Sequence, residues 1–91
     1  MNLNIDKYGG LTVVPIRCGS NYGTAFYVGK TQLMTATHIL KSHINNPETV
    51  NIEVLVGTKW ERCSIAAKFH PADITLLNCT VESVGGDFLE L

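Results

Sequence analysis

The feature that most constrains the fold of this chain is a series of short runs rich in β-branched and aromatic residues, each ended by turn residues. Runs of this length and composition are typical of β-strands. Residues 50–56 (VNIEVLV) alternate apolar and polar side chains, which indicates a strand with one buried face. Only residues 37–44 (THILKSHI) have helical periodicity, over about two turns. The expected strands cover residues 11–17, 24–28, 32–35, 50–56, 60–69 and 74–79.

Six short strands with almost no helix predict an all-β domain. An open sheet exposes unpaired backbone groups at its edges, and closing the sheet into a barrel removes those edges. We therefore expect a six-stranded antiparallel barrel, with an open sandwich as the competing arrangement. Pro15 lies inside the first run, and this predicts a sheet edge or a bulge at that position.

Composition narrows the classes of partner. The 91 residues allow one small domain. A net charge of −1 gives no electrostatic footprint for nucleic acid or for an anionic membrane surface. No apolar run approaches the ~20 residues of a membrane-spanning helix. Because only 16% of the residues are charged, we expect part of the apolar surface to face a protein partner.

The cysteines and the N-terminal segment indicate in which cellular compartment the protein is expected. Cys18, Cys63 and Cys79 are an odd number with no Cys-x-x-Cys spacing, which argues against a disulfide framework and against a zinc site. All three lie in apolar runs and are predicted to be core thiols. The N-terminal residues do not have the pattern of a signal peptide. Together these features favour a cytoplasmic location.

Two segments carry candidate catalytic residues. His38 follows the small residues of MTATHIL at the end of an expected strand, where it is either a structural ring or a general base facing a cleft. Asp73, in HPADITLLNC, directly precedes an apolar run and is either a surface residue or the partner of a histidine. His43 and His70 have polar or proline-flanked surroundings and are expected to be surface or packing residues.

The two segments resemble the N-terminal barrel of trypsin-like (chymotrypsin-fold) serine proteases. Residues 22–40 (YGTAFYVGKTQLMTATHIL) are similar to the family's Gly-x-x-Phe strand and its Leu-Thr-Ala-Ala-His strand end. Residues 73–77 (DITLL) resemble its Asp-Ile-Ala-Leu-Leu segment. The resemblance covers residues 22–79 and implies a Greek-key barrel, one half of a two-barrel fold. It also implies that His38 acts as base and then acid, while Asp73 orients its ring.

The chain departs from the family pattern in three places. Residue 37 is threonine where alanine is usual, and residue 39 is isoleucine where many secreted members have a disulfide-forming cysteine. Neither Gly-Asp-Ser-Gly-Gly nor Gly-x-Ser-x-Gly occurs, so the nucleophile motif is missing. The chain has four serines, and none has an oxyanion-hole context: Ser20, Ser42, Ser64 and Ser83.

The resemblance therefore implies half of a trypsin-like endopeptidase that acts on a protein or peptide, with no metal or nucleotide cofactor. Residues 1–84 would form the barrel, and residues 85–91 would begin the inter-barrel linker. A second barrel, on the same or a separate chain, would supply a serine or cysteine nucleophile. The alternative is a pseudoprotease half-domain that binds a protein or peptide without catalysis. An apolar face without its second barrel would be buried in a homodimer or covered by residues 88–91 (FLEL).

Overall fold

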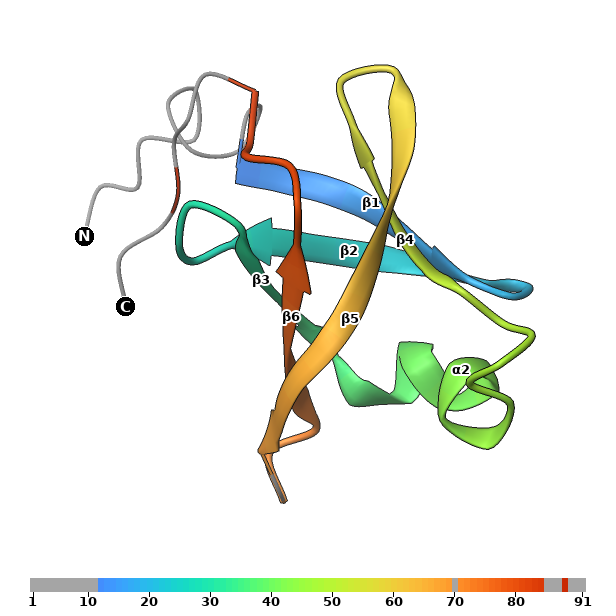
Figure 1. Cartoon of the computed structure of the whole chain (residues 1–91). Coiled ribbons are helices and arrows are strands. Elements are labelled where there is room, and N and C mark those ends of the chain that lie inside the picture. The colour runs from blue at the N-terminus through green and yellow to red at the C-terminus, as the bar shows by residue number, and fades with distance from the viewer. Residues whose placement is uncertain (1–11, 70, 85–87, 89–91) are drawn as a thin grey trace.

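A computed structural model describes residues 12–69, 71–84 and 88 and shows a closed, six-stranded antiparallel β-barrel (Figure 1). The strand order around the barrel is β1-β2-β3-β6-β5-β4. The predicted all-β barrel is confirmed, and the open sandwich is wrong. The strands are β1 (Val13–Cys18), β2 (Asn21–Tyr27), β3 (Gln32–Ala36), β4 (Ile52–Val56), β5 (Lys59–Phe69) and β6 (Ile74–Cys79).

The connectivity is that of a Greek key, because β4 returns to pair with β1 after the three consecutive strands β1, β2 and β3. The connection from β3 to β4 contains the 3₁₀ helix η1 (Thr37–Leu40) and the short helix α2 (Lys41–Asn45). Figure 1 shows this connection at one end of the barrel. It is the segment in which the sequence predicted about two helical turns. Among the described residues, no helix is long and apolar enough to cross a membrane.

Most strand boundaries differ from the expectation by one or two residues, and the largest difference, at the start of β2, is explained by tight turn geometry. Residues 21–23 were expected to lie in a turn, but they belong to β2. Cys18 and Asn21 are paired, so only Gly19 and Ser20 connect β1 to β2. Gly19 has a φ of +61°, a left-handed value that suits the primed two-residue hairpin turns. One glycine therefore reverses the chain, and the polar residues that follow continue the sheet.

Pro15 lies where the sheet leaves one side of β1 unpaired. It is opposite Thr24 of β2, whereas β4 pairs with β1 only from Ile16 to Cys18. Proline has no N–H to donate, so this position costs no ladder hydrogen bond. The predicted sheet edge at Pro15 is confirmed. A register shift occurs instead in β5, between Ile65 and Ala67, and it explains why the apolar alternation of this strand is irregular.

The core fills the barrel with alternate residues from every strand. In β4 the buried residues are Ile52, Val54 and Val56, as the alternation predicted. The three cysteines are free and buried, so the predicted core thiols are confirmed. The buried apolar residues are Val14, Ile16, Cys18, Ala25, Tyr27, Leu33, Leu40, Ile52, Val54, Val56, Cys63, Leu77 and Cys79.

The C-terminal segment is described only at Phe88, which is partly buried and packs against the core. That residues 88–91 cover the outer apolar side, one of the two alternatives expected, stays a prediction, because residues 89–91 lie outside the described residues. The predicted linker residues 85–87 and 89–91 lie outside the described residues, as does His70.

Candidate active site

The β3–β6 pairing brings His38 and Asp73 to the same end of the barrel. Ala36, the last residue of β3, lies opposite Ile74, the first residue of β6. His38 follows Ala36 by two residues, on the first turn of η1, and Asp73 directly precedes Ile74. Asp73 has a φ of +54°, a left-handed conformation that aspartate tolerates better than most residues. The turn into β6 thus places the carboxylate beside η1.

Both carboxylate oxygens of Asp73 interact with His38. The ring atom Nδ1 of His38 lies 2.7 Å from Oδ2, and the backbone N–H of His38 donates to Oδ1 over 3.1 Å. In addition, the backbone N–H of Thr37 donates to the carbonyl oxygen of Asp73 over 2.9 Å. The predicted proximity of His38 and Asp73 is confirmed. With Nδ1–H donating to the carboxylate, Nε2 is the ring nitrogen that can accept a proton.

This pair is open to solvent on one side. The side chains of His38 and Asp73 are 63% and 51% exposed. Water and salt weaken an ion pair that is this exposed, so its contribution to fold stability is small. The backbone around His38 and Asp73 therefore fixes the positions of the two side chains. A gain in fold stability does not explain why they meet.

A further hydrogen bond, between two threonines, connects the strand ends next to the His38–Asp73 pair. The hydroxyl oxygens of Thr37 and Thr75 lie 2.8 Å apart, and Thr75 is fully buried. Thr37 is one of the residues that depart from the family pattern, and Thr75 takes the place of an alanine in the resembled segment. Sequence analysis missed Thr75, although the paired departures at 37 and 75 were visible. Each hydroxyl satisfies the other, so neither polar group is left unpaired where β3 and β6 meet.

Replacing Thr75 with valine should lower the free energy of unfolding by about 1–3 kcal/mol. The shape is nearly kept, but the buried hydrogen bond to Thr37 is lost. Urea unfolding of the isolated chain measures the change, and Thr80→Val, at an exposed position, is the matched control. Equal stability of the Thr75→Val and Thr80→Val variants would show that the threonine pair does not hold the two strands together.

The other described histidine has a structural contact. His43 is partly buried in α2, and its Nδ1 lies 2.6 Å from the carbonyl oxygen of Val50. This contact joins α2 to the segment before β4 and confirms the packing role expected for His43. Among the described residues, no group of three or more His, Cys, Asp and Glu side chains could hold a metal ion.

A shallow apolar pocket of about 190 Å³ adjoins Asp73. Its walls come from β2, β3 and the start of β6 with the residue before it, and most of these residues face outward. They are Thr24, Phe26, Met34, Thr35, Ala36, Asp73 and Ile74. The apolar wall and the carboxylate therefore border the same hollow.

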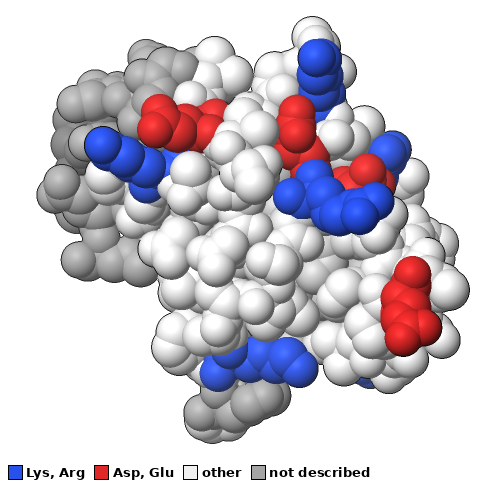
Figure 2. Space-filling model, in the orientation of Figure 1, with Lys and Arg blue, Asp and Glu red and all other residues white. Residues whose placement is uncertain are grey.

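The pocket is part of a larger apolar surface on the outside of the barrel. Phe26 lies opposite Met34, and Met34 lies opposite Leu76, so these side chains form a row across three strands. We call the following residues the outer apolar face: Phe26, Met34, Ala36, Ala67, Phe69, Ile74 and Leu76. Figure 2 shows an uncharged area in the middle of the view, with charged side chains above it, to its right and below it. Among the residues of this face, Phe69 is 45% exposed.

Comparison with known proteins gives a structural likeness but no sequence relative. No protein-family model and no curated protein matches the sequence. The chain is similar to the solved structure of the Rv3671c protease in an inactive form, with a TM-score of 0.61 and 23% identity. A serine-to-alanine mutant of Rv3671c from M. tuberculosis H37Rv, also in an inactive form, gives a TM-score of 0.61 and 23% identity.

The chain shares its barrel fold with part of a protease. The match covers 76% of this chain but only 32% and 31% of the two Rv3671c chains. This chain therefore spans about a third of the length of the proteins it resembles. At this level of identity the likeness establishes the fold, and the activity has to be argued from the residues of this chain.

Proposed function

We propose that this chain is the N-terminal barrel of a trypsin-like endopeptidase, in which His38 is the general base and Asp73 orients it. The observation that carries the proposal is the double contact of Asp73 with the ring and the backbone of His38. A carboxylate on Nδ1 fixes the tautomer and stabilises the imidazolium that forms during reaction. The shared fold with a protease supports the same function.

The reaction is acyl transfer from a peptide bond to a serine or cysteine nucleophile on a second barrel. Nε2 of His38 takes the proton from the nucleophile as the nucleophile attacks the carbonyl carbon. His38 then gives this proton to the leaving amine, and the acyl-enzyme is hydrolysed by water in a second cycle. Asp73 stays ionised throughout and keeps the ring in place.

The outer apolar face supports the existence of the second barrel as a partner. This face begins at the strand ends that carry the His38–Asp73 pair, and it includes Ala36 and Ile74 next to Asp73. A barrel that packed there would bring its nucleophile to the exposed side of His38. The same contact would exclude water from the pair, and the His38–Asp73 interaction would become stronger.

Covalent labelling with a fluorophosphonate tests this function. We expect no labelling of the chain alone above background, since its four serines would lack both a base and an oxyanion hole. In a protein that joins this chain to the second barrel, a serine nucleophile outside residues 1–91 should be labelled. A chloromethyl ketone serves the same purpose for a cysteine nucleophile.

Two variants make the labelling result decisive. His38→Ala should abolish labelling of the two-barrel protein, whereas His43→Ala should leave it intact because His43 contacts the backbone near β4. Stoichiometric labelling of a serine in the chain alone would contradict the division of the triad between two barrels. Peptide binding by the two-barrel protein without any labelling would support the pseudoprotease alternative instead.

A further inference from the structure

Two of the three cysteines face each other across neighbouring strands. Cys63 of β5 and Cys79 of β6 are direct partners in the antiparallel register. Both are free, and their exposed fractions are only 7% and 6%. Directly opposite residues of an antiparallel pair point to the same side of the sheet, so both side chains face the core.

The hydrogen-bond pattern shows that this pair is of the closer of the two kinds in an antiparallel ladder. The backbone N–H of Cys79 donates to the carbonyl oxygen of Thr31 over 2.8 Å, on the β3 side of β6. Because the backbone groups of Cys79 point toward β3, its pairing with Cys63 is of the non-hydrogen-bonded kind. Such pairs have Cα atoms ~4.5 Å apart. This separation falls within the ~4.4–6.8 Å that a disulfide bond requires.

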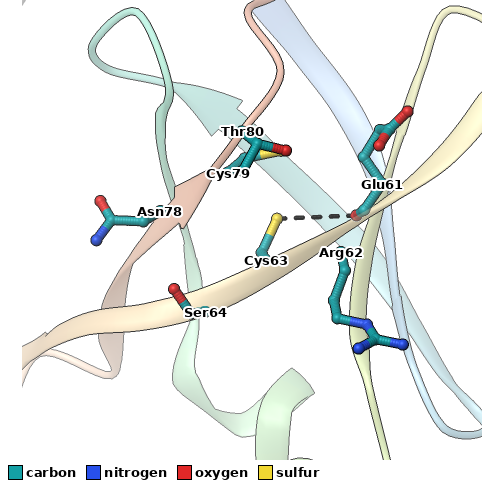
Figure 3. Close-up of a pocket in the computed structure, with 7 residues that line it drawn as sticks. All are labelled: Glu61, Arg62, Cys63, Ser64, Asn78, Cys79 and Thr80. Carbon is teal, nitrogen blue, oxygen red and sulfur yellow. Dashed lines mark hydrogen bonds between the residues drawn. The ribbon is translucent and has the colours of Figure 1, made fainter.

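A surface pocket adjoins the part of β5 and β6 that carries the two cysteines. The pocket has a volume of about 370 Å³ and is lined by both cysteines and by polar residues of β5 and β6 (Figure 3). Within it, Sγ of Cys63 lies 3.9 Å from the carbonyl oxygen of Glu61. The two cysteines therefore lie next to a solvent-facing hollow, although their side chains point into the core.

We propose that Cys63 and Cys79 are a reversible disulfide site that a hydroperoxide oxidises. In the first step, the sulfur of one cysteine attacks a peroxide oxygen, the O–O bond breaks, and a sulfenic acid and one water form. In the second step, the other thiol attacks the sulfenic sulfur and releases a second water. Two thiols thus lose two electrons and two hydrogens, and one hydrogen peroxide becomes two waters. A dithiol reductant reverses the reaction by thiol–disulfide exchange.

The site lies at the opposite end of β6 from the candidate active site. A bond between residues 63 and 79 would close the β5–β6 hairpin, and the turn of this hairpin carries Asp73. Oxidation would therefore restrain the element that positions Asp73. The inference does not depend on the proposed function, because it rests on the pairing of the two strands.

The local environment makes the reaction slow. Burial raises the pKa of the Cys63 thiol, and the neighbouring Cys79 thiol raises it further. Peroxides react with the thiolate, so a raised pKa lowers the fraction of reactive sulfur. Burial also raises the pKa of the Cys18 thiol, so Cys18 and Cys63 both have low reactivity. What distinguishes Cys63 from Cys18 is that a second cysteine lies opposite it in the sheet.

Peptide mapping of the intact chain tests the site. The folded chain is treated with hydrogen peroxide, denatured, alkylated with N-ethylmaleimide and digested with trypsin. Cleavage after Arg17, Arg62 and Lys68 places each cysteine in a different peptide. We expect a disulfide between the peptides 63–68 and 69–91, loss of two of the three alkylated cysteines, and full recovery after dithiothreitol.

Two controls keep the outcome decisive. Cys18→Ser should leave the cross-link unchanged, whereas Cys79→Ser should abolish it. If Cys79→Ser does not fold, peptide mapping of the wild-type chain still tests the proposal. The proposal is overturned if the oxidised wild-type chain keeps three alkylated cysteines. It is equally overturned if the main product joins Cys18 to another cysteine or links two chains.

Discussion

Replacing Asp73 with asparagine in the two-barrel protein should lower turnover by about 10⁴, the loss that the corresponding change causes in a trypsin-like protease. An asparagine can present its N–H₂ group to Nδ1, and the ring proton then moves to Nε2. Nε2 can no longer accept the proton of the nucleophile in that tautomer. Because Asp73 is half exposed in the isolated chain, Asp73→Asn should leave the stability of that chain nearly unchanged.

The measurement is kcat for hydrolysis of a peptide substrate by the wild-type and Asp73→Asn proteins. Glu53→Gln is a matched control, because it also neutralises a partly exposed carboxylate, in this case one paired with Arg17 at 3.0 Å. The control should keep full turnover. A loss smaller than about tenfold in Asp73→Asn would mean that Asp73 does not orient the base.

The second large effect is on stability. Replacing Leu77 with alanine should lower the free energy of unfolding by about 2–5 kcal/mol. Leu77 is fully buried between β3 and β5, so its truncation leaves a cavity in the barrel. Small domains have a total stability of about 5–15 kcal/mol, and this one change would remove a large part of it.

The neighbouring leucine provides the control. Leu76 lies on the other side of β6, in the outer apolar face, where it is partly exposed. Leu76→Ala should cost much less than Leu77→Ala in urea unfolding of the isolated chain. Equal losses at the two positions would mean that β6 does not present alternate residues to the core, and the assigned register would be incorrect.

The barrel could be predicted from the sequence because apolar and polar residues alternate along its strands and its turns are short. In β4 the period-two pattern of apolar residues specified both the strand and its buried face. His38 and Asp73 could be paired because each lies at a strand end, next to a recognisable motif. Each of the two residues belongs to a motif within its own segment, so both could be recognised without knowing the order of the strands in the sheet.

The features that sequence analysis missed depend on register. Thr37 and Thr75 meet only because Ala36 lies opposite Ile74, and Cys63 meets Cys79 only in the observed β5–β6 alignment. A shift of one residue would separate either pair. The irregular stretch of β5 near Ile65 hides this alignment, because a bulge changes which residues face the core.

The most direct measurement is the tautomer of neutral His38 in the isolated chain, from the ¹⁵N chemical shifts of its ring. Since Nδ1 lies 2.7 Å from the Asp73 carboxylate, we expect the proton on Nδ1 and a free lone pair on Nε2. In Asp73→Asn the proton should move to Nε2. A wild-type ring with its proton on Nε2, unchanged by Asp73→Asn, would contradict the assignment of His38 as a general base oriented by Asp73.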